Sequence, residues 1–291
     1  MTELVAVEGQ PRIGVLDGEQ RDGRVRSMVR LYATLARTSI MEQFQYRAAN
    51  YFYMIGMITE PVIYLVVWST IARQQGGDID GYTAGTFAAY YIVWTLVRNM
   101  NIVFTPFGWE ERIREGTLSA QLVRPIHPIH YDLGSFAGYK LVVIVLWLPI
   151  AGALAMIFKP ELSPSVAQIA TFAVAIWGAY LIRSLLLWML GMITFWTTRV
   201  TAIFEVYFAL ELLLSGRLLP VALMPDWVQD LAQYLPFEST FGFPITSLVG
   251  PITNAEQVEG LLRQLMWIAI GTVGVNLMWR RGVKAYTAVN G

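Results

Sequence analysis

The sequence predicts an all-α polytopic membrane protein with six transmembrane helices. Hydrophobic residues make up 55% of the 291-residue chain and charged residues only 14%, whereas about a quarter of the residues in a soluble domain are charged. Several apolar runs reach the ~20 residues that a helix needs to cross the hydrocarbon core. We expect one transmembrane domain over residues 27–291, with spans near residues 52–72, 83–105, 139–158, 168–196, 200–219 and 261–279.

The segment ahead of the first span predicts a helix on the membrane surface over residues 27–50, preceded by a mobile tail over residues 1–26. Arg26, Arg30 and Arg37 fall within about 40° of one another at 100° per residue, and Leu31 and Leu35 point the opposite way. Such a helix lies on the inner membrane surface with its arginines toward lipid headgroups or a partner protein. An anchoring leader without a further role is the alternative.

The distribution of basic residues indicates the orientation. If both termini are on the cytoplasmic side, the loops on the outer side carry only four basic residues, Arg73, Lys159, Arg217 and Arg263. Arg98 and Arg183 fall within spans, and all the other basic residues fall on the cytoplasmic side. This asymmetry follows the positive-inside rule and predicts that both termini are cytoplasmic.

The cytoplasmic segment between the second and third spans predicts a short amphipathic helix. Trp109, Ile113 and Gly116 share one face, and Glu110 can pair with Arg114 in the favourable orientation. Gly116 weakens the helix, and two prolines terminate the segment after it. A docking surface and a structural elbow are equally compatible with this pattern.

Beyond the fifth span, three apolar pieces at 214–227, 234–237 and 241–251 are too short and too interrupted to cross a membrane. Non-helical backbone at membrane depth survives only where protein or a water-filled cavity satisfies it. We therefore expect short re-entrant helices that dip into the outer leaflet between the fifth and sixth spans, with a surface loop as the alternative.

Ionisable residues inside spans are candidates for function because burying them in lipid is costly. Glu60, Glu205 and Glu211 are candidates for lining the transport path, where an inward-facing carboxylate among aromatic residues would bind a cationic substrate. The alternative is an interhelical ion pair of these carboxylates with Arg98 or Arg183.

Several kinds of chemistry are excluded or disfavoured. Without cysteine there are no disulfides, thiolate metal sites or cysteine nucleophiles. His127 and His130 are the only histidines and lack an accompanying carboxylate motif, so we expect loop structure and no metal site. The chain has no phosphate-binding loop and no nucleophile elbow, so we expect neither ATP binding nor catalysis by this chain itself.

A series of short motifs carries a family resemblance. Gly116-Thr-Leu118, Leu122-Val-Arg-Pro-Ile126 and Pro128-Ile-His-Tyr131 follow a Glu-rich turn, and Ser215-Gly-Arg-Leu-Leu-Pro220 and Met224-Pro-Asp-Trp227 come later. In this order and on a six-span plan, the chain resembles the membrane subunits of ABC type-2 transporters over nearly its whole length.

The resemblance implies a permease half in the cell inner membrane that sits on two copies of an ABC ATPase subunit, which bind ATP and Mg. It implies no cofactor in this chain, no nucleic-acid partner, and contacts with membrane lipids and a small-molecule or lipid-like substrate. The residues it assigns to coupling with the ATPase are Trp109, Glu110, Glu111, Arg112, Arg114, Glu115, Gly116 and Leu118.

Among its relatives, the chain looks most like the branch with two different permeases and one ATPase, linked to drug-type or viologen-type export. This favours export and a second, different permease, with a homodimer as the alternative. A membrane scaffold that recruits a cytoplasmic partner without transport is the competing function.

Overall fold

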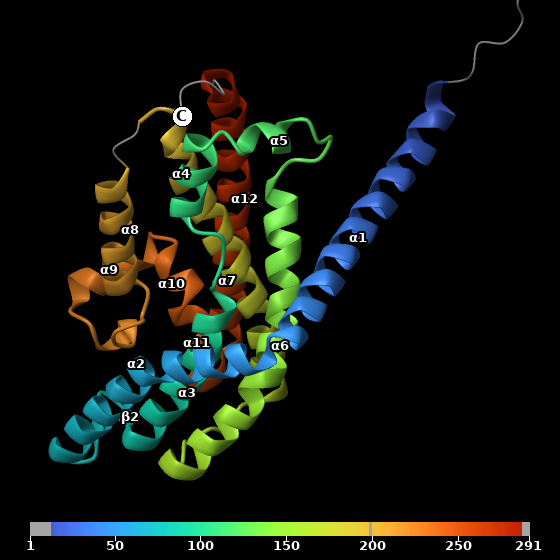
Figure 1. Ribbon diagram of the computed structural model, residues 1–291. Helices are drawn as coiled ribbons and strands as arrows, with labels where there is room; N and C mark the ends of the chain where they lie inside the picture. Colours follow the sequence, from blue (N-terminus) through green and yellow to red (C-terminus); the bar gives the residue numbers. More distant parts are fainter. Residues whose placement is uncertain (1–12, 198–199, 287–291) are drawn as a thin grey trace, which may run out of the picture.

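A computed structural model describes residues 13–197 and 200–286, and almost all of the described chain is helical (Figure 1). The longer helices are α1 (Ile13–Gln45), α2 (Arg47–Gln74), α3 (Ala84–Met100), α6 (Ile129–Phe158), α7 (Val166–Met192), α8 (Thr201–Leu214) and α12 (Asn254–Ala285). The short helices are α4 (Pro106–Arg114), α5 (Leu118–Leu122), η1 (Ile193–Phe195), η2 (Val221–Leu223), α9 (Asp226–Gln233), α10 (Phe237–Thr240) and α11 (Gly242–Val249). The strands β1 (Asp78–Ile79) and β2 (Tyr82–Thr83) form one antiparallel hairpin.

Four helical segments in the described part of the chain are long and apolar enough to cross a membrane. They are Ala48–Gln74, Ile129–Phe158, Val166–Phe195 and Asn254–Ala285. Two further expected spans, near 83–105 and 200–219, correspond to shorter helices. The 17 residues of α3 and the 14 of α8 cover about 26 Å and 21 Å at 1.5 Å per residue, less than the ~30 Å hydrocarbon core.

The N-terminal helix extends further than expected and rests on α6. Because α1 begins at Ile13, residues 13–26 of the expected tail are helical, while residues 1–12 lie outside the described part. A Cβ added at Gly138 of α6 would lie 2.5 Å from the Ala36 carbonyl oxygen, so glycine permits the close crossing of α1 over α6. Arg26, Arg30 and Arg37 are exposed on the other side of α1.

The centre of the bundle is α3, which is buried along nearly its whole length and packs against α2, α6 and α11. Its aromatic side chains Phe87, Tyr90, Tyr91 and Trp94 are almost completely buried. Tyr90 and Tyr91 donate hydrogen bonds to carbonyls of the segment after α8. The short helices α10 and α11 also belong to the bundle interior, because both pack on α7 and α11 packs on α3 as well.

Large apolar side chains cover the outside of α2, α6, α8 and α12. In a bundle whose interior already has its own core, an apolar exterior of this kind is the surface that lipid or another membrane subunit covers.

The two ends of the molecule differ. The segment α4–α5, the beginning of α1 and the end of α12 lie at one end, and the β1–β2 hairpin and the turn after α6 lie at the other (Figure 1). At the hairpin end, the Glu161 amide donates to the Gly85 carbonyl, and the Thr83 hydroxyl donates to the Glu161 carboxylate at 2.6 Å.

Candidate functional site

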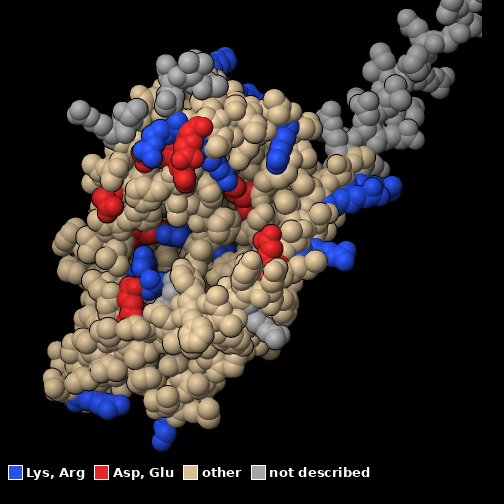
Figure 2. Space-filling view, in the orientation of Figure 1, with Lys and Arg blue, Asp and Glu red and all other residues tan. Residues whose placement is uncertain are grey.

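Acidic and basic side chains meet in the middle of the bundle, and we call them the charged cluster: Glu60, Arg98, Arg183, Glu211 and Arg217. Glu60 of α2 pairs with Arg98 of α3. Glu211 of α8, completely buried, forms a two-pronged pair with Arg183 of α7 at 2.7 and 2.9 Å. These are the ion pairs that the sequence offered as the alternative role for Glu60 and Glu211. Figure 2 shows acidic and basic side chains together in a hollow in the middle of the face in view, with further charged side chains toward the ends of the molecule.

Arg217 links the two pairs. It follows α8 at the Ser215–Gly216 break, where Gly216 has a positive φ of 83° that favours glycine. Its guanidinium lies 3.6 Å from a Glu60 oxygen and 4.0 Å from a Glu211 oxygen. The prediction from the sequence that Arg217 lies in the outer loops was wrong. The signal that could have indicated an interior position is an arginine between apolar residues at a helix break.

Lys140 is a second cation whose position the sequence missed. It was counted with the cytoplasmic residues, yet it is completely buried in α6, and its amine donates to the carbonyls of Asn99 at 3.0 Å and of Ile102. These carbonyls lie where α3 ends, a position that favours a cation because helix carbonyls there lack partners. A lysine at the start of a long apolar run was the available signal.

Glu205, the third expected path residue, does not join this cluster. It lies on the exposed face of α8, and no ion pair to it is recorded within the described residues. The structure therefore brings together Glu60 and Glu211 but not Glu205.

At the opposite end from the hairpin, α4 is anchored in the core by Trp109. The Trp109 ring is completely buried and packs edge-on against Trp188 at 4.5 Å. A Cβ at Gly191 of α7 would lie 2.6 Å from Trp109, so glycine provides the space for the ring. Leu118 of α5 is buried in the same cluster.

Arg112 ties α4 to α6. Its guanidinium donates to both Asp132 oxygens at 3.0 and 2.9 Å and lies 3.8 Å above the Phe104 ring. The expected pair between Glu110 and Arg114 also forms, at 3.6 Å. Trp109, Arg112 and Leu118 of the expected coupling residues are thus turned toward the bundle.

Three of the remaining coupling residues form a polar ridge. We use the term exposed ridge for Glu111, Arg114 and Glu115, which are all exposed. Gly116 follows them with a φ of 71° and turns the chain from α4 into α5. The exposed ridge is therefore held in place from below by the buried residues of the same two helices.

His127 belongs to the aromatic packing beneath this segment. Its ring lies 4.5 Å from that of Trp279, and its Nδ1 accepts the Ile129 amide at the start of α6. Burial, assisted by the neighbouring His130, lowers the pKa of His127 to about 4. No cluster of three or more metal-ligating side chains occurs in the described parts of the chain.

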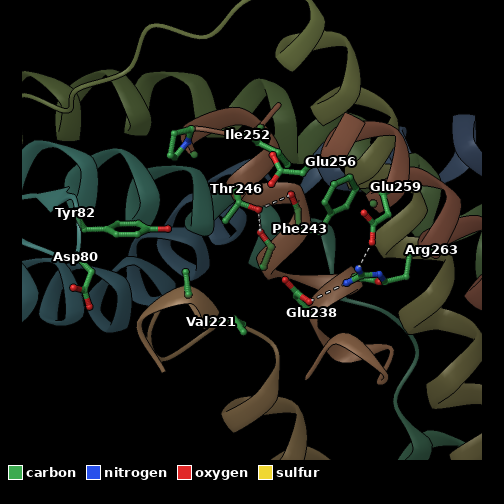
Figure 3. A pocket seen from close by; sticks show the side chains of 16 residues that line it. Asp80, Tyr82, Val221, Glu238, Phe243, Thr246, Ile252, Glu256, Glu259 and Arg263 are labelled. Atoms are coloured by element: carbon green, nitrogen blue, oxygen red, sulfur yellow. Dashed lines mark hydrogen bonds and ion pairs between the residues drawn. The ribbon is translucent and has the colours of Figure 1, made fainter. Parts of the chain in front are cut away.

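A cavity of about 550 Å³ opens near the hairpin, between β2, α10, α11 and the start of α12. Figure 3 shows Arg263 reaching toward both Glu238 and Glu259, with Asp80 and Tyr82 across the cavity. The two Arg263 contacts are 3.3 and 2.9 Å. We call it the outer pocket.

Comparison with known families decides the identity. The sequence model described as ABC-2 family transporter protein matches residues 58–290. The chain belongs to the ABC-2 transporter family. A comparison with curated proteins found no match.

Membership in the ABC-2 transporter family makes the chain the membrane component of a transporter, a multi-pass permease that works with an ABC ATPase. The match begins inside α2 and includes the charged cluster, the α4–α5 segment and the outer pocket. The α1 helix lies outside the matched residues.

Proposed function

We propose that this permease is the membrane half of an ATP-driven exporter in the cell inner membrane, with both termini in the cytoplasm and no catalytic activity of its own. ATP and Mg are bound by two copies of a partner ATPase. Closure of that ATPase shifts the permease between inward-open and outward-open conformations. Export fits better than import because the α4–α5 segment does not resemble the coupling loop of binding-protein-dependent importers.

The four long apolar helices give four crossings. The other two of the proposed six are α3 together with the segment after it and α8 together with the turn after it. This arrangement supports the proposed orientation, because the beginning of α1, the α4–α5 segment with its arginines and the basic end of α12 share one side. We assign the short helices α9–α11 to the outer leaflet.

One observation carries the coupling proposal: α4 presents a charged edge on one side and a buried tryptophan on the other. When the ATPase displaces the exposed ridge, the displacement is transmitted to α7 through the contact of Trp109 with Gly191, because a close-packed interior transmits strain. Arg26, Arg30 and Arg37 of α1, which are all exposed, are assigned to lipid headgroups or the ATPase.

We assign the outer faces of α2 and α8 to a second permease, a different chain in preference to a second copy. Both faces carry large exposed apolar residues, such as Ile63 on α2 and Leu213 on α8. They belong to the two helices that supply Glu60 and Glu211 to the charged cluster, so a partner there would enclose the proposed substrate path.

The test is affinity purification of the tagged full chain in mild detergent, with mass spectrometry and an ATPase assay on the eluate. Changing Glu111, Arg114 and Glu115 together to alanine should lower ATPase recovery about tenfold if this edge is the contact. Lys159→Ala, exposed at the opposite end, is the matched control. Gly116 is unsuitable because any side chain there strains the turn.

The eluate also discriminates among partners. A second permease beside the ATPase supports the mixed complex, and its absence with an intact ATPase supports a homodimer. Equal ATPase recovery from the triple variant and the control overturns the assigned contact. A chain that retains a cytoplasmic protein without nucleotide hydrolysis in several detergents supports the scaffold function instead.

A further inference from the structure

The charged cluster contains more positive than negative groups. Three guanidiniums share two carboxylates, and these five groups are Arg98, Arg183, Arg217, Glu60 and Glu211. The Lys140 amine in the same part of the bundle is held by backbone carbonyls and is not counted in this balance. Among the described residues, this cluster therefore has one guanidinium more than it has carboxylates.

Arg217 is the cation with the poorest compensation. Its nearest carboxylate oxygens, at 3.6 and 4.0 Å, lie beyond hydrogen-bond distance. Its Nε is buried without a partner, and among the described residues no hydrogen bond from its guanidinium is recorded. Arg98 and Arg183, by contrast, each donate to a carboxylate. A planar guanidinium with its donors free is a group that binds phosphate or carboxylate through two parallel hydrogen bonds.

There is space beside Arg98 and beside Glu60, whose carboxylate lies 3.6 Å from the Arg217 guanidinium. A cavity of about 380 Å³ is lined by Gly56, Thr59, Glu60, Ile63, Tyr64 and Arg98. The guanidiniums of Arg98 and Arg217 both lie near the Trp94 ring, at 5.2 and 5.8 Å from its centre. Glu60 is paired with both of them, so its carboxylate occupies the position that an external anion would take.

An apolar surface adjoins the polar one. Ile63, Val66 and Val67 lie on one face of α2 at spacings of three and four residues and are about half exposed. Ile63 also lines the cavity. A ligand with an anionic head and an apolar chain would meet complementary groups along its whole length.

We propose that this cleft binds the anionic head of an amphiphile, a phosphate or carboxylate, through Arg217 and Arg98 in competition with Glu60. The apolar chain lies along the Ile63 face of α2. This inference names the substrate class of the proposed exporter and rests on that function. The outer pocket offers no equivalent site, because its Arg263 is already bound by Glu238 and Glu259.

The experiment is calorimetric titration of the purified full chain in a non-ionic detergent. The probes are dihexanoyl phosphatidic acid, dihexanoyl phosphatidylcholine with the same chains but no net charge, and inorganic phosphate. We expect phosphatidic acid to bind more tightly than phosphatidylcholine. Binding of inorganic phosphate with equal affinity identifies a free anion as the ligand, and weaker binding identifies an amphiphile.

Two variants give opposite expected shifts. Arg217→Gln should weaken phosphatidic acid binding about tenfold, the loss of a charge-assisted hydrogen-bond pair. Glu60→Gln, which removes the competing carboxylate, should strengthen it, a gain that a partly unfolded protein would not show. Arg73→Gln, an exposed arginine at the end of α2, is the control and should leave affinity unchanged.

Equal binding of the two lipids, or unchanged affinity in both cluster variants, overturns the anion site. If Arg217→Gln does not fold, the Glu60→Gln result alone decides, with weaker or equal binding counting against the proposal. The titration needs no ATPase. Failure of the anion site with an intact permease–ATPase complex leaves the proposed function standing, and anion binding without any ATPase partner removes transport but keeps the site.

Discussion

Two glutamates on the same helix show how differently one residue type is used. Glu211 has no exposed surface and neutralises Arg183, while Glu205, six positions earlier, faces outward. Removing one partner of a buried ion pair is strongly destabilising because the other charge then stays buried and uncompensated.

We predict that Glu211→Gln destabilises the protein by about 3 to 5 kcal/mol, because Arg183 loses its carboxylate. Glu205→Gln should stay within about 0.5 kcal/mol of wild type. Thermal unfolding of both variants in the same detergent checks this. Equal melting temperatures for the two variants would contradict the role of Glu211 as the anchor of Arg183.

His127 gives a pH dependence with a defined sign. Its folded pKa of about 4 lies below the ordinary 6.5, so between these values the unfolded chain binds a proton that the folded chain does not. Stability should therefore fall as the pH is lowered from about 7.5 to about 4.5. We expect about 1 to 2 kcal/mol from this group, allowing for solvent screening of a partly exposed ring.

The check is thermal unfolding across this pH range for wild type and His127→Asn, which keeps an acceptor for the Ile129 amide. The variant should lose part of the acid sensitivity. An identical slope in both proteins would show that the ring of His127 is not kept neutral by its surroundings.

At the scale of elements, the glycines of α6 determine where α1 lies. Gly138 faces the α1 backbone, whereas Gly152 of the same helix has open space around it. We predict that Gly138→Leu separates α1 from α6 and increases tryptic cleavage after Arg37 about tenfold. Gly152→Leu is the control and should leave cleavage unchanged. Unaltered cleavage in Gly138→Leu would mean that α1 is held elsewhere.

The apolar runs predicted helices reliably but did not predict their lengths. Length and hydropathy alone predicted a span over residues 83–105, yet α3 ends at Met100 and the chain restarts at Pro106, which favours a first helical turn. Similarly, α8 ends at Leu214 because Gly216 turns the chain back into the bundle. Such breaks depend on tertiary contacts, including that of Lys140 with the end of α3, that periodicity does not contain.

For the molecule as a whole, the sequence predicted the class, the family and most of the elements, and it identified Glu60 and Glu211. It could not place Arg217, because the residues that surround it come from helices far apart in the chain. It also treated Trp109 as part of a displayed surface, whereas the ring is completely buried. A helical face predicts which residues lie together, and only the packing of α4 on α7 decides which side is covered.

The helix α6 joins the two ends of the molecule. Its first turn is bound to α4 through Asp132 and Arg112, and the turn after its last residue is bound to α3 through Glu161. Its 30 residues span about 45 Å. A rotation of α6 at its α4 end would therefore displace the β1–β2 hairpin at the other end, less the part of the motion that is absorbed by bending at Pro149 inside the helix.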